Sequence, residues 1–139
     1  MSLTIQEVPL NFVNQVWPHI EGFIREAMEY SQGEYTAEDA RVYCVSGLWT
    51  VIVAVDMANT IRGAALVNYF NRPSNRVAFI MAIGGRLVVN RETWAQFEGI
   101  LRANGATSLE GAVRESVGRL WRRYGMTPKY TIVGKSLLA

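Results

Sequence analysis

The chain has 139 residues, about the length of one domain; half of its residues are apolar and 19% are charged. This composition supports a folded core and excludes a disordered, highly charged chain. The formal net charge of +2 gives no general signature of polyanion binding. One cysteine, Cys44, cannot form an internal disulfide, and together with one histidine, His19, it cannot build a Cys/His zinc site.

The beginning of the chain predicts a strand and a helix. Residues 3–8 alternate imperfectly between apolar and polar side chains, which is typical of a first strand. Apolar residues then recur at gaps of three and four from Phe12 to Met28, as on one face of a helix. Because Pro18 interrupts this stripe, we expect a short turn before it and a helix over residues 18–30.

A loop and a second helix are expected next. Residues 31–34 contain serine, glycine and polar residues and indicate a loop. Thr36 is followed by two acidic residues, a pattern typical of a capped helix start. We expect this helix to run to about Ser46 and to end at Gly47.

The middle of the chain predicts three neighbouring strands. Residues 49–55 form a continuous, mostly β-branched apolar run, which favours a strand covered on both faces. Residues 61–70 and 77–83 predict two more strands, separated by turns at residues 56–59 and 71–75. Short turns between successive strands predict an antiparallel meander.

The last third of the chain returns to alternating helices and strands. Asparagine and glycine at the expected helix ends, and apolar residues three and four apart, mark two helices. The expected elements are a helix from an Asn90 cap to Asn104-Gly105, a strand over 107–113, a helix carrying Val117, Leu120, Trp121 and Tyr124, and a strand over 130–135.

The resulting order is β-α-α-β-β-β-α-β-α-β, within a single domain over residues 1–139. Its strand-helix-strand ending implies parallel pairing through right-handed crossovers, while the meander is antiparallel. We therefore expect an α/β fold with a mixed sheet and helices on both faces. No apolar segment is long enough to span a membrane, and the N-terminus lacks the pattern of a signal peptide, so we expect a cytoplasmic protein.

This order, and the segment Arg-Leu-Trp-Arg-Arg-Tyr-Gly-Met at residues 119–126, resemble GNAT-type acyltransferases, which carry Leu-Tyr and Gly-Phe pairs before a late strand. Gly63-Ala64, a glycine pair after the central strand and an early helix with a tryptophan are similar to short GNAT-like proteins of tailed bacteriophages. The resemblance implies a GNAT-like fold, acetyl-CoA as cofactor, no metal, and transfer of an acyl group to an amine.

The family's cofactor loop reads Arg/Gln-x-x-Gly-x-Gly/Ala, where glycines let backbone N–H groups approach a pyrophosphate at a helix N-terminus. Here residues 83–92 read IGGRLVVNRE, so the glycines precede the arginine and bulky residues follow it. The glycine pair is explained equally well by a turn that ends the strand. The resemblance implies cofactor binding at Ala82, Gly84, Gly85, Arg86 and Arg91.

The residues with acid-base chemistry also depart from the family pattern. The tyrosine that often acts as general acid is replaced by Trp121, and Tyr124 lies nearly one turn further on. Tyr124 is therefore a candidate acid or a core residue. Glu110, in the strand over 107–113, is a candidate general base or an outward-facing strand residue. The family's asparagine corresponds to Arg114.

Other residues have simpler explanations. We expect Cys44 to be a buried small apolar residue and His19 to be exposed or locally hydrogen-bonded. A basic cluster forms either a solvated face or a phosphate contact; it comprises Arg114, Arg119, Arg122, Arg123 and Lys129. The low net charge and the lack of interleaved aromatic residues argue against nucleic acid as a partner.

Two hypotheses about function remain open at the level of sequence. The first is an acetyl-CoA-dependent N-acyltransferase with an altered cofactor loop, in which a backbone amide near residues 82–84 polarises the thioester and Glu110 or a water acts as base. The second is a catalytically inactive GNAT-like phage accessory or virion-associated protein that acts through protein contacts. Fold alone does not separate them. A homodimer is compatible with either hypothesis.

Overall fold

The computed structural model describes residues 2–30 and 33–138, and a five-stranded sheet lies at its centre. The strands are ordered in space as they are along the chain, and all neighbours are antiparallel except β4 and β5, which are parallel. The expected meander and mixed sheet are confirmed. The strands are β1 (Thr4–Glu7), β2 (Thr50–Val55), β3 (Ile61–Arg72), β4 (Asn75–Gly85) and β5 (Ser108–Gly111).

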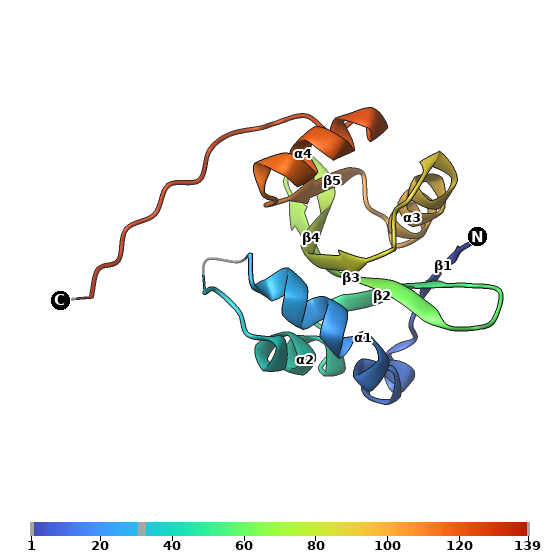
Figure 1. The fold of residues 1–139 in the computed structure, drawn as a ribbon. Coiled ribbons are helices and arrows are strands. Elements are labelled where there is room, and N and C mark those ends of the chain that lie inside the picture. Colours follow the sequence, from blue (N-terminus) through green and yellow to red (C-terminus); the bar gives the residue numbers. More distant parts are fainter. Residues whose placement is uncertain (1, 31–32, 139) are drawn as a thin grey trace.

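Helices cover both faces of the sheet (Figure 1). On one face lie α1 and α2, and on the other lie α3 and α4. The 3-10 turns η1 and η2 precede α1 and follow α4. The bounds are η1 (Leu10–Phe12), α1 (Val13–Met28), α2 (Ala37–Val45), α3 (Arg91–Ala103), α4 (Glu115–Trp121) and η2 (Arg122–Tyr124).

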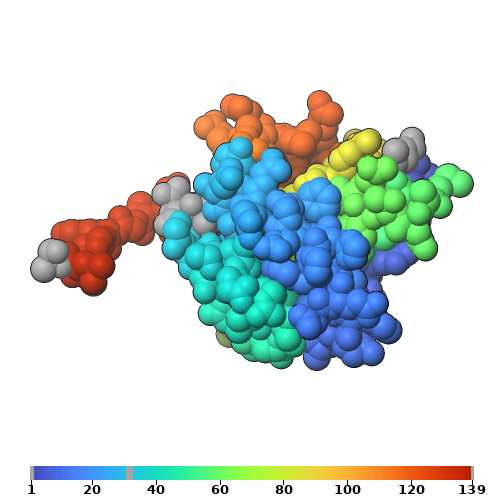
Figure 2. All heavy atoms as spheres, turned by 60° about the horizontal axis from the view of Figure 1, so that its bottom comes forward, coloured from blue at the N-terminus to red at the C-terminus, as the bar shows by residue number. Residues whose placement is uncertain are grey.

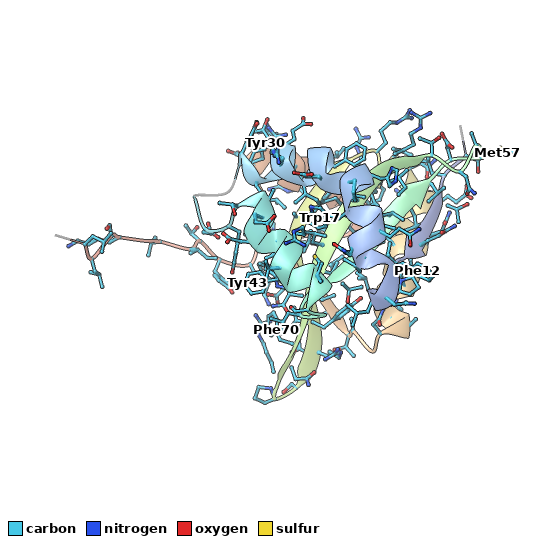
Figure 3. The ribbon with its side chains drawn as sticks, turned by 90° about the horizontal axis from the view of Figure 1, so that it is seen from below. Phe12, Trp17, Tyr30, Tyr43, Met57 and Phe70 are labelled. Carbon is cyan, nitrogen blue, oxygen red and sulfur yellow. The ribbon has the colours of Figure 1, made fainter. Side chains whose placement is uncertain are left out.

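The alternation of side chains along β2 divides the interior into two cores. Val51, Val53 and Val55 face α1 and α2, whereas Ile52 and Ala54 face α3 and α4. All five side chains are buried, so the expectation of a strand covered on both faces is confirmed. Figure 3 shows the first of these faces, with α1 and α2 in front of the strands and the α1 residue Trp17 labelled.

The prediction that a helix begins at Pro18 is wrong. Pro18 lies inside α1, which already begins at Val13 after the η1 turn. Proline removes one backbone donor and usually costs about 3 kcal/mol inside a helix. Burial of Val13 and Trp17 one turn earlier, in line with Ile20, offsets that cost.

Helices α2 and α3 begin where their capping residues predicted. The Thr36 hydroxyl accepts a hydrogen bond from the Asp39 amide, and the Asp39 carboxylate accepts one from the Thr36 amide. Asn90 and Thr93 form the equivalent capping box at α3. Of the loop expected over residues 31–34, Ser31 and Gln32 lie outside the described residues.

The strand expected over residues 130–135 is not present. After η2, the left-handed Gly125 ends the helical segment, and residues 126–138 form neither helix nor strand. Figure 1 shows this segment running away from the body of the protein. Its β-branched pattern is that of a strand, but a strand also needs a neighbour to accept its backbone hydrogen bonds, and among the described residues no strand pairs with this segment.

Two classes of feature are not found in the described part of the chain. Within residues 2–30 and 33–138, none of the helices combines the length and apolar character needed to cross a bilayer. Over the same residues, no three histidine, cysteine, aspartate or glutamate side chains gather where a metal ion could be held.

Candidate functional site

The central feature of the site is the way β4 leaves β5. The two strands pair from Val77 opposite Ser108 to Ile80 opposite Gly111, and β4 then continues to Gly85 without β5 beside it. At the same point the register between β3 and β4 slips, so that Met81 is an extra residue in β4. Such a bulge bends its strand and increases the local twist. Residues 81–85 therefore form a fork with the segment that follows β5.

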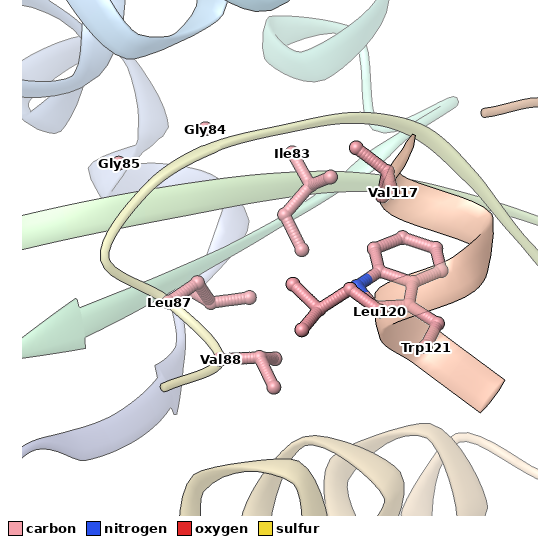
Figure 4. A pocket seen from close by; sticks show the side chains of 8 residues that line it. All are labelled: Ile83, Gly84, Gly85, Leu87, Val88, Val117, Leu120 and Trp121. Atoms are coloured by element: carbon pink, nitrogen blue, oxygen red, sulfur yellow. The ribbon is translucent and has the colours of Figure 1, made fainter. Parts of the chain in front are cut away.

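A pocket of about 140 Å³, lined by apolar side chains and two glycines, lies in this fork. The end of β4 and the following loop form one wall, and α4 forms the other (Figure 4). In Figure 4, the α4 side chains face Ile83, Leu87 and Val88 across the pocket. The lining residues are Ile83, Gly84, Gly85, Leu87, Val88, Val117, Leu120 and Trp121.

The fork exposes backbone groups next to apolar side chains. On the edge of β4 away from β3, residues 81–85 have no partner strand among the described residues. Alternate backbone N–H and C=O groups of a strand point to each of its two edges. A ligand with an amide or a carbonyl could therefore bind this edge as an added strand would, with its apolar part in the pocket. The predicted site residues Ala82 and Gly84 both lie on this stretch.

Packing against α1 and β3 explains the two glycines without any ligand. A Cβ atom on Gly84 would lie 2.6 Å from the backbone oxygen of Phe23. Gly85 has a φ of 69°, and a Cβ there would lie 2.6 Å from the backbone oxygen of Arg62. These contacts favour the structural explanation of the glycine pair, while both residues still line the pocket.

Several backbone amides in the loop from β4 to α3 already donate hydrogen bonds within the protein. The amides of Val89 and Asn90 donate to the hydroxyl of Thr93 at 2.9 and 3.2 Å, and the Thr93 amide donates to the Asn90 side chain. The amide of Arg86 donates to the backbone oxygen of Arg62. Fewer amides are thus left for an anion than in a bare glycine loop.

Arg86 and Arg91 are both exposed, at the two ends of this loop. Within the described residues, neither guanidinium group forms a salt bridge. Arg91 is the first residue of α3, whose N-terminus carries a partial positive charge. The two predicted cofactor-binding arginines are therefore positioned to add charge near the mouth of the loop.

Glu110 is held by two cations away from the pocket. Its carboxylate accepts hydrogen bonds from both terminal nitrogens of Arg72, and from Lys129 Nζ at 2.8 Å. The alternative of an outward-facing residue is wrong, because the side chain is only 6% exposed. The hydrogen bonds from Arg72, together with the one from Lys129, lower the pKa of Glu110 to about 2. A carboxylate with so low a pKa is a weak base.

The aromatic residues of the last helical segment belong to the core. Trp121 is buried and contributes to the pocket wall. Tyr124, the candidate acid, stacks on Trp94 with ring centroids 4.7 Å apart and is not among the residues that line the pocket. The indole of Trp121 offers only an N–H donor and does not titrate. Neither side chain is placed here as a general acid.

The basic cluster is not one continuous face. Arg114 lies over the ring of Tyr30 at 3.8 Å and ties the end of α1 to the start of α4, while Lys129 contacts Glu110. Arg119, Arg122 and Arg123 are exposed, which fits a solvated helix face.

Cys44 and His19 have the roles expected from the sequence. Cys44 is fully buried, and burial raises the pKa of its thiol to about 12, so it is a small core residue and not a nucleophile. His19 lies on the exposed side of α1. These outcomes leave the fork as the candidate site.

Sequence reasoning missed most of the pocket wall. From the sequence, the bulk of Leu87 and Val88 argues only against a bare cofactor loop, whereas in the structure both residues line the pocket. The α4 residues Val117, Leu120 and Trp121 follow the i, i+3, i+4 spacing that was used to predict the helix. A helix as short as α4 does not bury side chains on all of its faces. This shortness would have been the sequence signal that its apolar stripe faces a cavity.

No protein-family model matches the sequence, and no curated protein matches it. Solved structures do match. Aminoglycoside acetyltransferase HMB0005, from an uncultured soil metagenomic sample, is 14% identical, with a TM-score of 0.68 over 99% of this chain and 100% of that chain. Aminoglycoside acetyltransferase meta-AAC0020 from such a sample, in complex with sisomicin, is 12% identical, with a TM-score of 0.69 over 99% and 96% of the two chains. A predicted acetyltransferase with acetyl-CoA from Clostridium acetobutylicum is 9% identical, with a TM-score of 0.62 over 98% and 97%. The chain thus has the mixed α/β fold of GNAT acetyltransferase structures.

Proposed function

We propose that this protein is an N-acyltransferase that takes its acyl group from acetyl-CoA at the fork between β4 and α4. One observation carries the proposal: within the described residues, β4 continues through residues 81–85 with a free edge, directly beside a pocket lined by apolar side chains. An acyl thioester needs both features, an N–H donor for its carbonyl oxygen and an apolar surface for its methyl and methylene groups. The likeness to acetyltransferase structures over nearly the whole chain supports this choice.

The residues of the fork fit the thioester end of the cofactor. A backbone N–H of residues 82–84 would donate to the thioester carbonyl oxygen and stabilise the negative charge that develops there. Ile83, Leu87 and Val117 would hold the acyl end and exclude water. When bound, coenzyme A would supply an acyl group activated as a thioester, which a neutral amine can attack directly.

The phosphate end of the cofactor would lie near the N-terminus of α3. There, Arg86 and Arg91 would contribute positive charge, and the amides at the beginning of α3 would add their dipoles. Because Thr93 already accepts hydrogen bonds from two loop amides, we expect binding in this region to depend more on the two arginines than on the backbone.

Proton transfer would use solvent water and not a side chain. Glu110 stays ionised and paired with Arg72 and Lys129, and Tyr124 stacks on Trp94. A water molecule at the fork would therefore take the proton of the amine, and the thiolate of coenzyme A would leave without a positioned acid. We accordingly expect slow catalysis and a rate that rises with pH as the amine loses its proton.

A second candidate function is a domain that has lost catalysis and acts through protein contacts, as an accessory or virion-associated protein of a phage would. It is favoured by the same loop: Leu87 is buried, and Thr93 engages amides that a pyrophosphate would need. Trp121 in place of an acid is a second observation in its favour.

Titration calorimetry with coenzyme A and acetyl-CoA separates the two candidates. Binding by the fork predicts saturable heat and a thermal stabilisation that reaches about 2.7 kcal/mol at a hundredfold excess over the dissociation constant. Arg86→Ala and Arg91→Ala should each weaken coenzyme A binding roughly tenfold without lowering the melting temperature. Absence of binding at millimolar ligand would exclude the N-acyltransferase and favour a domain that acts through protein contacts.

A second pair of variants locates the acyl end. Val117→Phe places a ring in the pocket and should abolish acetyl-CoA binding, while Ser116→Phe adds the same ring to an exposed position of the same helix and should have no effect. Equal binding by the two variants would show that the acyl group lies elsewhere.

A further inference from the structure

The C-terminal segment, residues 126–138, exposes apolar side chains that a folded chain would normally bury. Tyr130, Ile132 and Val133 are 68%, 73% and 87% exposed, and Leu137 and Leu138 about 90%. Figures 1 and 2 show this segment projecting away from the body of the protein. Large apolar side chains that are exposed close together in one segment, as opposed to scattered over the surface, indicate a surface that is covered by a partner.

The same segment has the sequence pattern of a strand without a neighbour. Tyr130 and Ile132 would lie on one face of such a strand, and Thr131 and Val133 on the other. Both faces would then carry apolar or β-branched side chains, which is typical of a strand with material packed on each side. The segment is therefore suited to add to the edge of an existing sheet and not to remain in water.

Strand β5 offers such an edge. It pairs with β4 on one side, and on its other side the described residues contain no strand and no backbone hydrogen bond to Ser108–Gly111. Unprotected edges of this kind are sites where another strand pairs. In the described part of the chain, the free edge and the free strand are thus both present.

The beginning of the tail is fixed beside this edge. Lys129 Nζ contacts the Glu110 carboxylate of β5 at 2.8 Å, so the tail leaves the body next to β5. Beyond this contact, the residues run outward and do not turn back onto their own β5 (Figure 1). Residues 130–138 could extend over roughly 30 Å, since a strand rises about 3.3 Å per residue. That length is enough to reach a sheet edge in another molecule.

We propose that residues 130–135 pair with the free edge of β5 in a second copy of this chain, and that two copies exchange these segments reciprocally. Each copy offers one strand and one edge, so the exchange closes into a symmetric dimer with no strand left over. Pro128, which has no N–H group and has its φ fixed, lies just before the segment and favours an extended exit from the body. The proposal is independent of whether the fork binds a thioester.

The test uses the full chain and two proline variants. Sedimentation or light scattering should give a dimer for the unmodified chain, with slow hydrogen exchange over residues 130–135. Ile132→Pro removes a donor within the pairing segment and should raise the dimer dissociation constant at least about tenfold. Ser136→Pro lies outside the segment and should leave the dimer intact. Because these residues contact no core in a single chain, neither variant should change its secondary structure.

Mixing isotopically labelled and unlabelled chains shows which molecule supplies the strand. Nuclear Overhauser effects between residues 130–135 of one chain and 108–111 of the other would support the exchange. Three results would overturn it: a monomer at all concentrations, contacts of the tail with β5 of its own chain only, or a dimer that Ile132→Pro leaves unchanged.

Discussion

The two halves of β4 differ in a way that explains where a ligand can bind. From Val77 to Ile80 the strand is paired on both edges, with β3 and β5. From Met81 to Gly85 it is paired on one edge only. Buried backbone groups are nearly always hydrogen-bonded, so the paired half is fixed by the protein itself. In the open half, the backbone groups on the outer edge of the strand remain available to a ligand.

The open half is nevertheless closely packed from behind, against α1 and β3. Gly84 and Gly85 lie where any side chain would meet the backbone of α1 or β3. The strand is thus held from behind while its outer edge remains free. Rigid support behind a free edge is what a preorganised binding site requires.

The largest loss of stability is expected when a side chain is added where the open half of β4 contacts α1 and β3. Gly85→Ala forces a left-handed φ on alanine and a contact with the oxygen of Arg62, so the free energy of unfolding should fall by roughly 3 kcal/mol. Gly99→Ala is the matched control, because nothing lies within 4 Å of a Cβ there. In the middle of α3 it should raise stability by about 0.5–1 kcal/mol. Chemical denaturation measures both; similar losses in the two variants would refute the packing argument.

Local patterns predicted the fold as far as β5. Alternation and turns located the three central strands, and the capping residues Thr36 and Asn90 located two helix starts. The expected helix start at Pro18 is wrong because proline's helix propensity is a local property, whereas burial of the residues before it is a property of the whole fold. Residues 130–135 have the β-branched pattern of a strand, but whether a strand forms depends on a pairing neighbour, which the sequence pattern does not specify.

A loss of stability of intermediate size is expected at Glu110, which lies on β5, the strand that pairs with the first half of β4. Glu110→Gln removes the charge that Arg72 and Lys129 contact, and because both cations are partly exposed the loss should be about 1–2 kcal/mol at neutral pH. The folded-state pKa of about 2 lies below the ordinary 4.5, so this stabilisation is full above pH 4.5 and is lost as the pH falls toward 2.

Denaturation across this pH range checks the sign. The gap in stability between the unmodified chain and Glu110→Gln should shrink from pH 4.5 to pH 2. A gap that stays constant would mean that the ion pairs do not contribute. An unchanged acyl transfer rate in this variant would agree with a structural role for Glu110, whereas loss of transfer with intact coenzyme A binding would restore it as a base.

The smallest effect is expected in the loop that follows the open half. Thr93→Val keeps the shape of a buried side chain but removes the acceptor for the amides of Val89 and Asn90, so stability should fall by about 1 kcal/mol. Thr93→Ser keeps the hydroxyl and should lose less. Amide hydrogen exchange should become faster at Val89 and Asn90 in Thr93→Val alone; equal exchange in both variants would show that the hydroxyl does not hold the loop.

The candidate site was predictable only in part. The sequence indicated backbone chemistry near residues 82–84, because histidine and metal ligands were scarce and the resemblance placed the cofactor there. It could not show the extra residue Met81, since a bulge leaves no distinctive mark in a run of apolar residues. Nor could it show that Glu110 is paired, because Arg72 and Lys129 lie 38 and 19 positions away along the chain.

The central claim is that the open half of β4 binds an acyl thioester. Titrating isotopically labelled protein with acetyl-CoA, and following backbone amide resonances, tests it most directly. We predict saturable shifts for amides of residues 81–85 and for Val117, with little change at residues 75–80. No shift, or shifts confined to the paired half of the strand, would contradict the claim.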